Sequence, residues 1–196
     1  MIQNYIQPTA EVDPSALIGA GTRVWHHAQV MAQAQIGVDC VLGKGVFVDR
    51  GVRIGDRCKM QNYAQLFKGC SIADEVFIGP GAVLANDRVP RAASPEGILK
   101  TELDWSVEGS VIDHGASIGA MATILPGVRV GRWAMVGAGA VVVADVPDHG
   151  LVVGNPARQI GLVCCCGQRI DGPPTTCEKC ARSFRSTADG KVEMGL

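Results

Sequence analysis

The sequence predicts an all-β fold, a parallel β-helix in which very short strands wind into a solenoid. Three observations predict it: aliphatic residues recur every six positions, 25 glycines are spread along the chain, and only 5% of the residues are aromatic. A period of six fits neither an α-helix nor an alternating strand, and it indicates a short strand followed by a corner. Three such units form one coil, so residues 18 positions apart should stack.

The first block of repeats covers residues 6–84. Every sixth position is aliphatic: Ile6, Val12, Ile18, Val24, Val30, Ile36, Leu42, Val48, Ile54, Met60, Leu66, Ile72, Ile78 and Leu84. The residue four places later is small or β-branched throughout, which predicts a narrow inner corner. Glycine often follows the aliphatic residue, as at Gly19 and Gly79, and we expect it there because it adopts backbone angles that other residues resist.

The pattern resumes in a shifted phase at Ile112 and continues to Val142. Between the two blocks lies a stretch with Pro90, Pro95 and Gly97, which predicts a long loop over about 86–110. Long loops without repeats are costly to order and usually carry function, so we expect this insertion to belong to a functional site.

Composition excludes several classes of function. The net charge of −1 gives no indication of a nucleic-acid-binding surface, and no apolar run is long enough to cross a bilayer. The N-terminus lacks the basic start and apolar block of a signal peptide. We therefore expect a cytoplasmic protein, in which the eight cysteines favour metal binding over disulfides.

Four motifs, in this order along the chain, carry a resemblance to a known family. They are Arg23-Val24-Trp25-His26, Lys59-Met60-Gln61-Asn62, Asn86-Asp87-Arg88-Val89-Pro90-Arg91 and Val153-Gly154-Asn155-Pro156-Ala157-Arg158. With the repeat, they make residues 6–158 resemble the hexapeptide-repeat acyltransferases. Within that family, the chain is most similar to bacterial enzymes that N-acetylate the 3-amino group of UDP- or dTDP-linked sugars, including 2-acetamido-3-amino-2,3-dideoxyglucuronate.

The resemblance implies a left-handed coil, a homotrimer and acetyl-CoA as co-substrate, with CoA in the groove between neighbouring chains. It implies an N-acetyltransferase that acts on a nucleotide-linked amino sugar in surface polysaccharide (lipopolysaccharide) or glycoside biosynthesis. The substrate-binding residues that it suggests are His26, Lys59, Gln61, Asn62, Arg88 and Arg91. Contacts to CoA are expected at Ala120, Ala138 and Arg158. The guanidinium group of Arg158 is suited to binding a phosphate of CoA.

The related sugar enzymes are thought to work without a histidine base, through direct attack of the amine on the thioester. Asn86 and Asp87 match the positions that orient the amine, which makes them the catalytic candidates. An amide can orient an amine or stabilise an oxyanion without changing its protonation state. Both residues are also common in turns, so a purely structural role is the alternative.

The histidines give no confident base. His114 is expected at a surface corner, and His149 is expected in a turn. His26 lies in a matching motif, but an outward-facing stacking role fits it equally well. The 18-residue register predicts two outward columns, one of Arg50, Lys68 and Asn86 and another of His26, Lys44 and Asn62. The phosphates of a nucleotide sugar or of CoA can lie along one of these columns; alternatively, the cationic side chains are simply solvated.

The repeat stops after Arg158, and we divide the chain into a β-helix over 1–160 and a cysteine-rich tail over 161–196. The tail predicts a zinc-ribbon-like module in which Cys164, Cys166, Cys177 and Cys180 hold a structural zinc ion. Cys165 is then spare, and two disulfides are the alternative. Cys40, Cys58 and Cys70 fall at small-corner positions and are expected to be packing residues.

Three other functions fit the fold. An O-acyltransferase, or another small-molecule acyltransferase, would use the same coil. A γ-type carbonic anhydrase would need three histidines around a metal, a pattern that this sequence does not match. A scaffold solenoid would need neither the Asn86-Asp87 loop nor Arg158, and it should not bind CoA.

Overall fold

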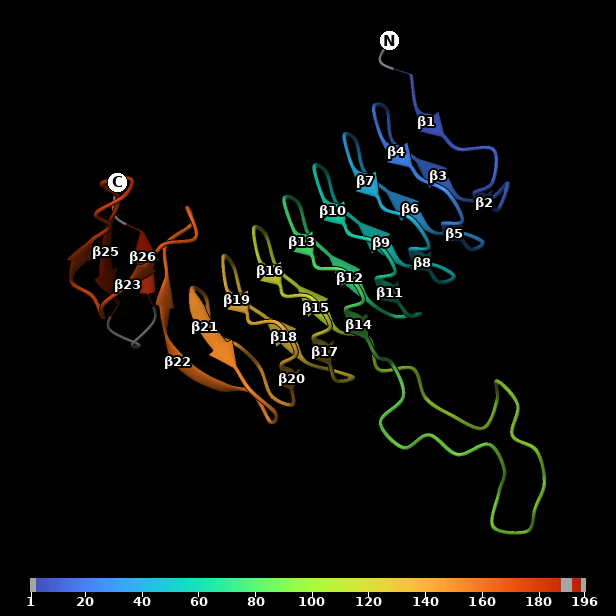
Figure 1. The fold of residues 1–196 in the computed structure, drawn as a ribbon. Coiled ribbons are helices and arrows are strands. Elements are labelled where there is room, and N and C mark those ends of the chain that lie inside the picture. Colours follow the sequence, from blue (N-terminus) through green and yellow to red (C-terminus); the bar gives the residue numbers. More distant parts are fainter. Residues whose placement is uncertain (1–2, 188–191, 195–196) are drawn as a thin grey trace.

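The computed structural model describes residues 3–187 and 192–194. All the regular elements in this part of the chain are β-strands, and most of them are only two residues long. They wind into a solenoid of stacked coils, from which one long loop projects and which a small module closes at its C-terminal end (Figure 1). The β-helix that the repeat predicts is confirmed, and its left-handedness stays a prediction.

Three parallel sheets, named A, B and C here, form the faces of the solenoid. Sheet A starts with β1 (Tyr5–Ile6), β4 (Arg23–Val24), β7 (Val41–Leu42), β10 (Lys59–Met60), β13 (Phe77–Ile78), β16 (Ser117–Ile118) and β19 (Met135–Val136). Sheet B holds β2 (Glu11–Val12), β5 (Gln29–Val30), β8 (Phe47–Val48), β11 (Gln65–Leu66), β14 (Val83–Leu84), β17 (Thr123–Ile124) and β20 (Val141–Val142). Sheet C holds β3 (Leu17–Ile18), β6 (Gln35–Ile36), β9 (Arg53–Ile54), β12 (Ser71–Ile72), β15 (Val111–Ile112) and β18 (Arg129–Val130).

The register confirms the 18-residue stacking. Met60 pairs with Leu42 below it and with Ile78 above it, each 18 positions away. Ile72 pairs with Ile112, 40 positions later, so the loop inserts 22 residues without disturbing the stack. From β4 to β20 each strand ends on a buried aliphatic residue, and these side chains form one continuous core.

The glycine that follows an aliphatic residue has a different role from the expected one. Positive φ angles occur instead three residues after the aliphatic residue, at positions held by glycine or by residues such as His27 and Tyr63. A Cβ on Gly79 would instead lie 2.6 Å from the backbone nitrogen of Ala120 in the next coil. Glycine is therefore used there because neighbouring coils approach closely, and the expectation about its backbone angles was wrong.

At the C-terminal end the chain reverses direction. Sheet A continues into β21 (Gly150–Val153), β22 (Arg158–Val163) and β23 (Arg169–Ile170), and the last two pairings are antiparallel. A separate small sheet contains β24 (Thr175–Thr176), β25 (Ser183–Ser186) and β26 (Val192–Met194). Because β22 runs through the expected boundary at residue 160, the tail is joined to the solenoid by a shared strand.

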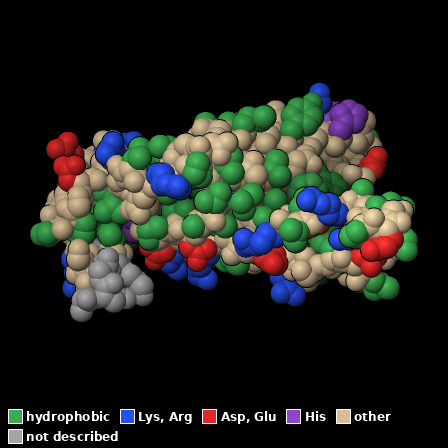
Figure 2. Space-filling model, turned by 90° about the horizontal axis from the view of Figure 1, so that it is seen from below, with side chains coloured by type: hydrophobic (Ala, Val, Ile, Leu, Met, Phe, Trp, Pro, Cys, Tyr) green, Lys and Arg blue, Asp and Glu red, His purple; other side chains and the backbone are tan. Residues whose placement is uncertain are grey.

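No helix among the described residues is long and apolar enough to cross a membrane. Lys and Arg side chains are interspersed with Asp and Glu on the face in Figure 2, rather than forming a continuous basic strip.

Candidate active site and cysteine centre

The catalytic candidates lie where the long loop leaves sheet B. Strand β14 ends at Leu84, so Asn86 is a loop residue and does not end the strand. Its amide nitrogen Nδ2 donates a hydrogen bond to the Lys68 carbonyl oxygen at 3.0 Å, which confirms the stacking of these two residues. An Asp87 carboxylate oxygen accepts from the Val89 backbone N–H at 2.9 Å, as in an Asx turn.

Arg88 joins the two ends of the loop to the solenoid. Its Nε donates to Glu108 at 3.0 Å, and one terminal nitrogen donates to the Pro126 carbonyl oxygen at 2.6 Å. Arg91, in contrast, is exposed and contacts the neighbouring Pro90 carbonyl oxygen. Of the two arginines expected to bind substrate, Arg88 therefore also positions the loop.

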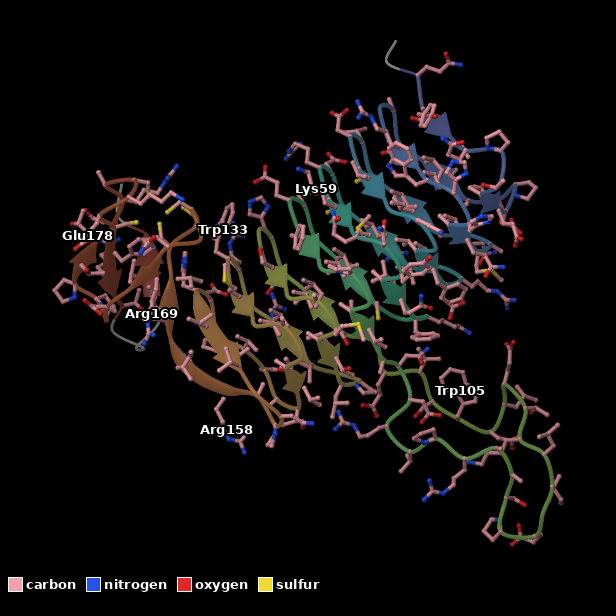
Figure 3. The ribbon with its side chains drawn as sticks, in the orientation of Figure 1. Lys59, Trp105, Trp133, Arg158, Arg169 and Glu178 are labelled. Atoms are coloured by element: carbon pink, nitrogen blue, oxygen red, sulfur yellow. The ribbon has the colours of Figure 1, made fainter. Side chains whose placement is uncertain are left out.

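The loop contains a hollow of about 500 Å³. Its lining includes Asp87 and Arg91, which the sequence singled out, together with Lys100 and Trp105, which it did not. Trp105 is half-buried and lies on the projecting loop, outside the stacked coils (Figure 3). A signal was available for it, since a tryptophan in a polar insertion is unusual in a chain with so few aromatic residues.

A second group of candidates lies at the corner between sheets A and B. His26, Gln61 and Asn62 line a shallow hollow there together with Trp25 and Lys44. The His26 Nδ1 atom lies 2.8 Å from the Thr9 hydroxyl, and an Asn62 carbonyl oxygen accepts from the Lys44 backbone N–H at 2.9 Å. Lys59 is exposed on neighbouring β10 (Figure 3).

The expected CoA residues continue along the same corner. Gly139 donates its backbone N–H to the Ala120 carbonyl oxygen at 2.8 Å, so the turn containing Ala138 stacks on the turn containing Ala120. The β21–β22 turn stacks next, through a 2.8 Å bond from the Ala157 N–H to the Val141 carbonyl oxygen. Arg158 follows that turn and is exposed (Figure 3).

The candidates are therefore divided between two corners of the prism. His26, Asn62, Ala120 and Ala138 share the corner between sheets A and B. Asn86 and the residues after it begin at the next corner, between sheets B and C, where Arg50 and Lys68 precede Asn86 in the register. Within one chain, the strands of sheet B separate the two groups.

The remaining histidines do not form a catalytic cluster. His114 is a corner residue, as expected, with its Nε2 3.6 Å from a Glu75 oxygen and its ring against Trp133. His149 lies in a turn with φ of 60°, as expected, but its side chain is buried. Its Nδ1 donates to the Val163 carbonyl oxygen at 2.9 Å, and burial lowers its pKa. Sequence reasoning missed this burial.

The four cysteines predicted to bind metal come together in the tail. The sulfur atoms of Cys164, Cys166, Cys177 and Cys180 all lie within 4.8 Å of one another, and they form the one such cluster of potential ligands in residues 3–187 and 192–194. All eight cysteines are free thiols. The disulfide alternative is therefore not what the structure contains.

Hydrogen bonds lower the pKa of one member of this cluster. Bonds from the Arg182 backbone and side chain lower the pKa of Cys180 to about 6, which makes it a thiolate at neutral pH, the form that binds metal. Cys40, Cys58 and Cys70 are buried in the solenoid core, as expected of packing residues. Burial raises the pKa of Cys70 to about 11.

Comparison with known proteins agrees with this architecture. The family described as "hexapeptide repeat of succinyl-transferase" matches residues 33–62 and 111–144. A dTDP-3-amino-3,6-dideoxy-α-D-galactopyranose 3-N-acetyltransferase of Aneurinibacillus thermoaerophilus is 49% identical over 61 residues, which cover 31% of this chain and 32% of the relative. The matched stretches span about a third or less of the first curated relatives' own length.

Two solved structures extend the similarity. PerB from Caulobacter crescentus, in complex with CoA and GDP-perosamine, is 28% identical with a TM-score of 0.51, over 82% of this chain and 58% of that one. A putative acetyltransferase of Bacillus cereus is 22% identical with a TM-score of 0.54, over 84% of both chains, and it shares the fold. The chain therefore contains hexapeptide repeats, and the proteins to which it is similar include an N-acetyltransferase of a nucleotide-linked amino sugar.

Proposed function

We propose that this protein is an acetyl-CoA-dependent N-acetyltransferase that acts on the amino group of a nucleotide-linked sugar. The observation that carries the proposal is the similarity to PerB over 82% of the chain, since the PerB structure contains both CoA and a nucleotide-linked amino sugar. The 49% identity to a dTDP-3-amino-sugar enzyme favours a 3-amino group. The product would serve surface polysaccharide or glycoside synthesis in the cytoplasm.

The chemistry needs a neutral amine held close to the thioester carbonyl carbon. The amine lone pair forms the new C–N bond, the carbonyl oxygen becomes an oxyanion, and the C–S bond then breaks to release CoA as a thiolate. The ammonium proton that the amine carries after attack passes to Asp87 or to that thiolate. We assign Asn86 to hydrogen bonding with the amine or the oxyanion.

We further propose that the active site forms between chains of a homotrimer. The separation of the candidates at two corners supports this, because a neighbouring chain can present its loop to the corner that holds Ala120 and Ala138. The outward side chains of sheet B between these corners are uncharged from β5 to β20: Gln29, Phe47, Gln65, Val83, Thr123 and Val141. Sheets A and C carry Lys59 and Arg53 on their outward faces, so sheet B is better suited to contact another chain.

Thiol release tests the proposed function. Purified protein should release CoA from acetyl-CoA when UDP-, dTDP- or GDP-linked amino sugars are added, and it should release little with the matching sugars that carry a hydroxyl group instead. Turnover that is equal with both types of sugar would indicate an O-acyltransferase. Failure to turn over any nucleotide-linked sugar would reject the proposal.

A further inference from the structure

The two cysteine-containing turns of the tail are closed by similar hydrogen bonds, although the second turn is one residue longer. In the first, the Cys164 N–H donates to the Gln168 carbonyl oxygen and the Gly167 N–H donates to the Cys164 carbonyl oxygen, both at 2.8 Å. In the second, Cys177 forms the corresponding pair of bonds with Arg182 and Ala181, also at 2.8 Å. Each turn connects two antiparallel strands, β22 to β23 and β24 to β25.

The residue after the second cysteine has a positive φ in both turns, 84° at Gly167 and 57° at Ala181. A left-handed backbone angle is unfavourable for alanine, so something must favour the same path in the second turn. In each turn this path brings the sulfur atoms of two cysteines to the side that faces the other turn. Two hairpins of unrelated sequence thus present a pair of thiols to each other.

The sulfur positions fit a tetrahedral metal ion. Cys164 and Cys180 have sulfur atoms 3.4 Å apart, and those of Cys166 and Cys177 are 3.6 Å apart. Zinc–sulfur bonds of about 2.3 Å in a tetrahedron put the sulfur atoms roughly 3.8 Å from one another. Ligation therefore needs adjustments of only a few tenths of an ångström at these pairs.

The tail has little else to hold it together. Among its described residues, the buried members of its hydrophobic cluster are Cys164, Ile170, Cys177 and Phe184, and two of these are thiols of the proposed site. A unit of this size rarely folds on hydrophobic burial alone, and metal ligation is a common substitute.

The solenoid contacts the residue directly before the first cysteine. The Val163 N–H donates to the His149 carbonyl oxygen at 2.8 Å, and the His149 ring donates back to the Val163 carbonyl oxygen at 2.9 Å. The same ring packs edge-on against Phe184, with centroids 5.2 Å apart. His149 thus joins the last coil to both hairpins of the tail.

We propose that the tail binds one structural zinc ion through Cys164, Cys166, Cys177 and Cys180, and that the zinc-bound tail is held on the last coil by His149. This goes beyond acetyl transfer and does not depend on it. One structural consequence concerns a groove of about 810 Å³ between the two parts. Pro147 and Asp148 line it from the solenoid, and Leu162 and Ile170 line it from the tail, so zinc would hold one of its walls in place.

Metal analysis of the full chain, purified under reducing conditions, tests the ligand set. We expect about one zinc per chain in the native protein and almost none in Cys177→Ser. Cys165→Ser is the control, because Cys165 lies in the first cysteine turn, with its sulfur 3.9 Å from that of Cys164, but outside the proposed set. It should retain zinc. No zinc, another metal in stoichiometric amount, or equal zinc loss in Cys165→Ser would overturn the proposal.

Hydrogen exchange tests the link to the solenoid and guards against a variant that simply misfolds. Removing zinc with a chelator should speed amide exchange in residues 158–187 and leave the strands from β4 to β19 protected. His149→Phe, which keeps a ring beside Phe184 but loses the Nδ1 donor, should retain zinc and still loosen β22. Unchanged exchange in the tail after metal removal, or in β22 of His149→Phe, would show that the proposed coupling is wrong.

Discussion

The amide of Asn86 donates a 3.0 Å hydrogen bond to the carbonyl oxygen of Lys68, one coil earlier. This bond fixes the orientation of the amide at the residue where the long loop leaves the solenoid. It uses one of the two N–H groups of the side chain. The second N–H group can donate a hydrogen bond to a substrate, and the side-chain carbonyl oxygen can accept one. A group held in this way costs little reorganisation when charge develops beside it.

We expect Asn86→Ala to lower kcat by about 10² to 10³, the usual cost of losing one preorganised donor, with CoA affinity nearly unchanged. The His26→Ala, His27→Ala and His114→Ala variants should stay within about tenfold of wild type, since losing a general base typically costs 10² to 10⁴. Steady-state kinetics at varied acetyl-CoA concentration measure kcat and the KM for acetyl-CoA of each variant. An inactive histidine variant beside an active Asn86→Ala would replace direct attack with a histidine base.

Asp56→Ala is the structural control for Asn86→Ala. The Asp56 carboxylate accepts from the Val38 backbone N–H at 2.9 Å, so it also joins its side chain to the backbone of the preceding coil, but as an acceptor and at a different corner. It should lose comparable stability and keep its turnover. If both variants lost activity equally, the role of Asn86 would be structural.

Attachment of the tail should weaken as the pH falls. Burial lowers the pKa of His149, while Asp148 acts to raise it and Arg132 to lower it. The exposed ring takes up a proton below about pH 6.5, so the docked state is fully stable above that value and loses stability as the pH drops towards the lower pKa of the buried ring. Amide exchange in β22 should therefore be faster at pH 5.5 than at pH 7.5.

His149→Gln separates this effect from acid release of metal, because glutamine offers an N–H donor and does not titrate. Its β22 should show much less dependence on pH. If the variant and the native protein responded alike, titration of another group, such as a cysteine of the cluster, would be responsible.

Substitution of Gly79 by alanine should destabilise the solenoid. Its Cβ would lie 2.6 Å from the Ala120 backbone nitrogen, and backbone cannot move aside as a flexible side chain can. Overpacking of this kind typically costs about 1–3 kcal/mol, which denaturant unfolding measures. Gly172→Ala is the control, because a Cβ there meets nothing within 4 Å, and it should change stability little.

Light scattering in solution should give the mass of a homotrimer. The two groups of candidate residues are separated by sheet B within one chain, so the proposed site needs a neighbouring chain to bring them together. Trp105→Ala, in the projecting loop, and Ala138→Trp, at the opposite corner, should each lower activity, and mixing the two variants should restore part of it. A fully active monomer, or mixed variants with no recovery, would contradict an active site shared between chains.

Much of the fold could be predicted because one residue in six is constrained in the same way. Leu66 and Ile78 must be aliphatic because each stacks on a residue 18 positions away inside a narrow core. The 22-residue insertion is visible in the sequence because it interrupts this period. The four cysteines could be predicted because sulfur ligands follow simple spacing rules. The spacing of Cys164 and Cys166 was unusual, but a tight turn at Gly167 accommodates it.

Other features depend on contacts that a period does not encode. The burial of His149 arises only when the tail folds back on the last coil, so its turn-like sequence gave no sign of it. Arg88 reaches Pro126, 38 positions away, and its positioning role required the folded loop. The reason for glycine at position 79 is the backbone of residue 120, which lies on the far side of the insertion.

The bond formed in the product tests the central claim most directly. Nucleotide-linked amino sugar and acetyl-CoA should be incubated with the protein, and the isolated sugar should be examined by mass spectrometry and NMR before and after hydroxylamine treatment. The account predicts one added acetyl group, attached to the amino nitrogen as an amide and stable to hydroxylamine. An acetyl ester that hydroxylamine removes, or an unmodified sugar after acetyl-CoA has been consumed, would contradict it.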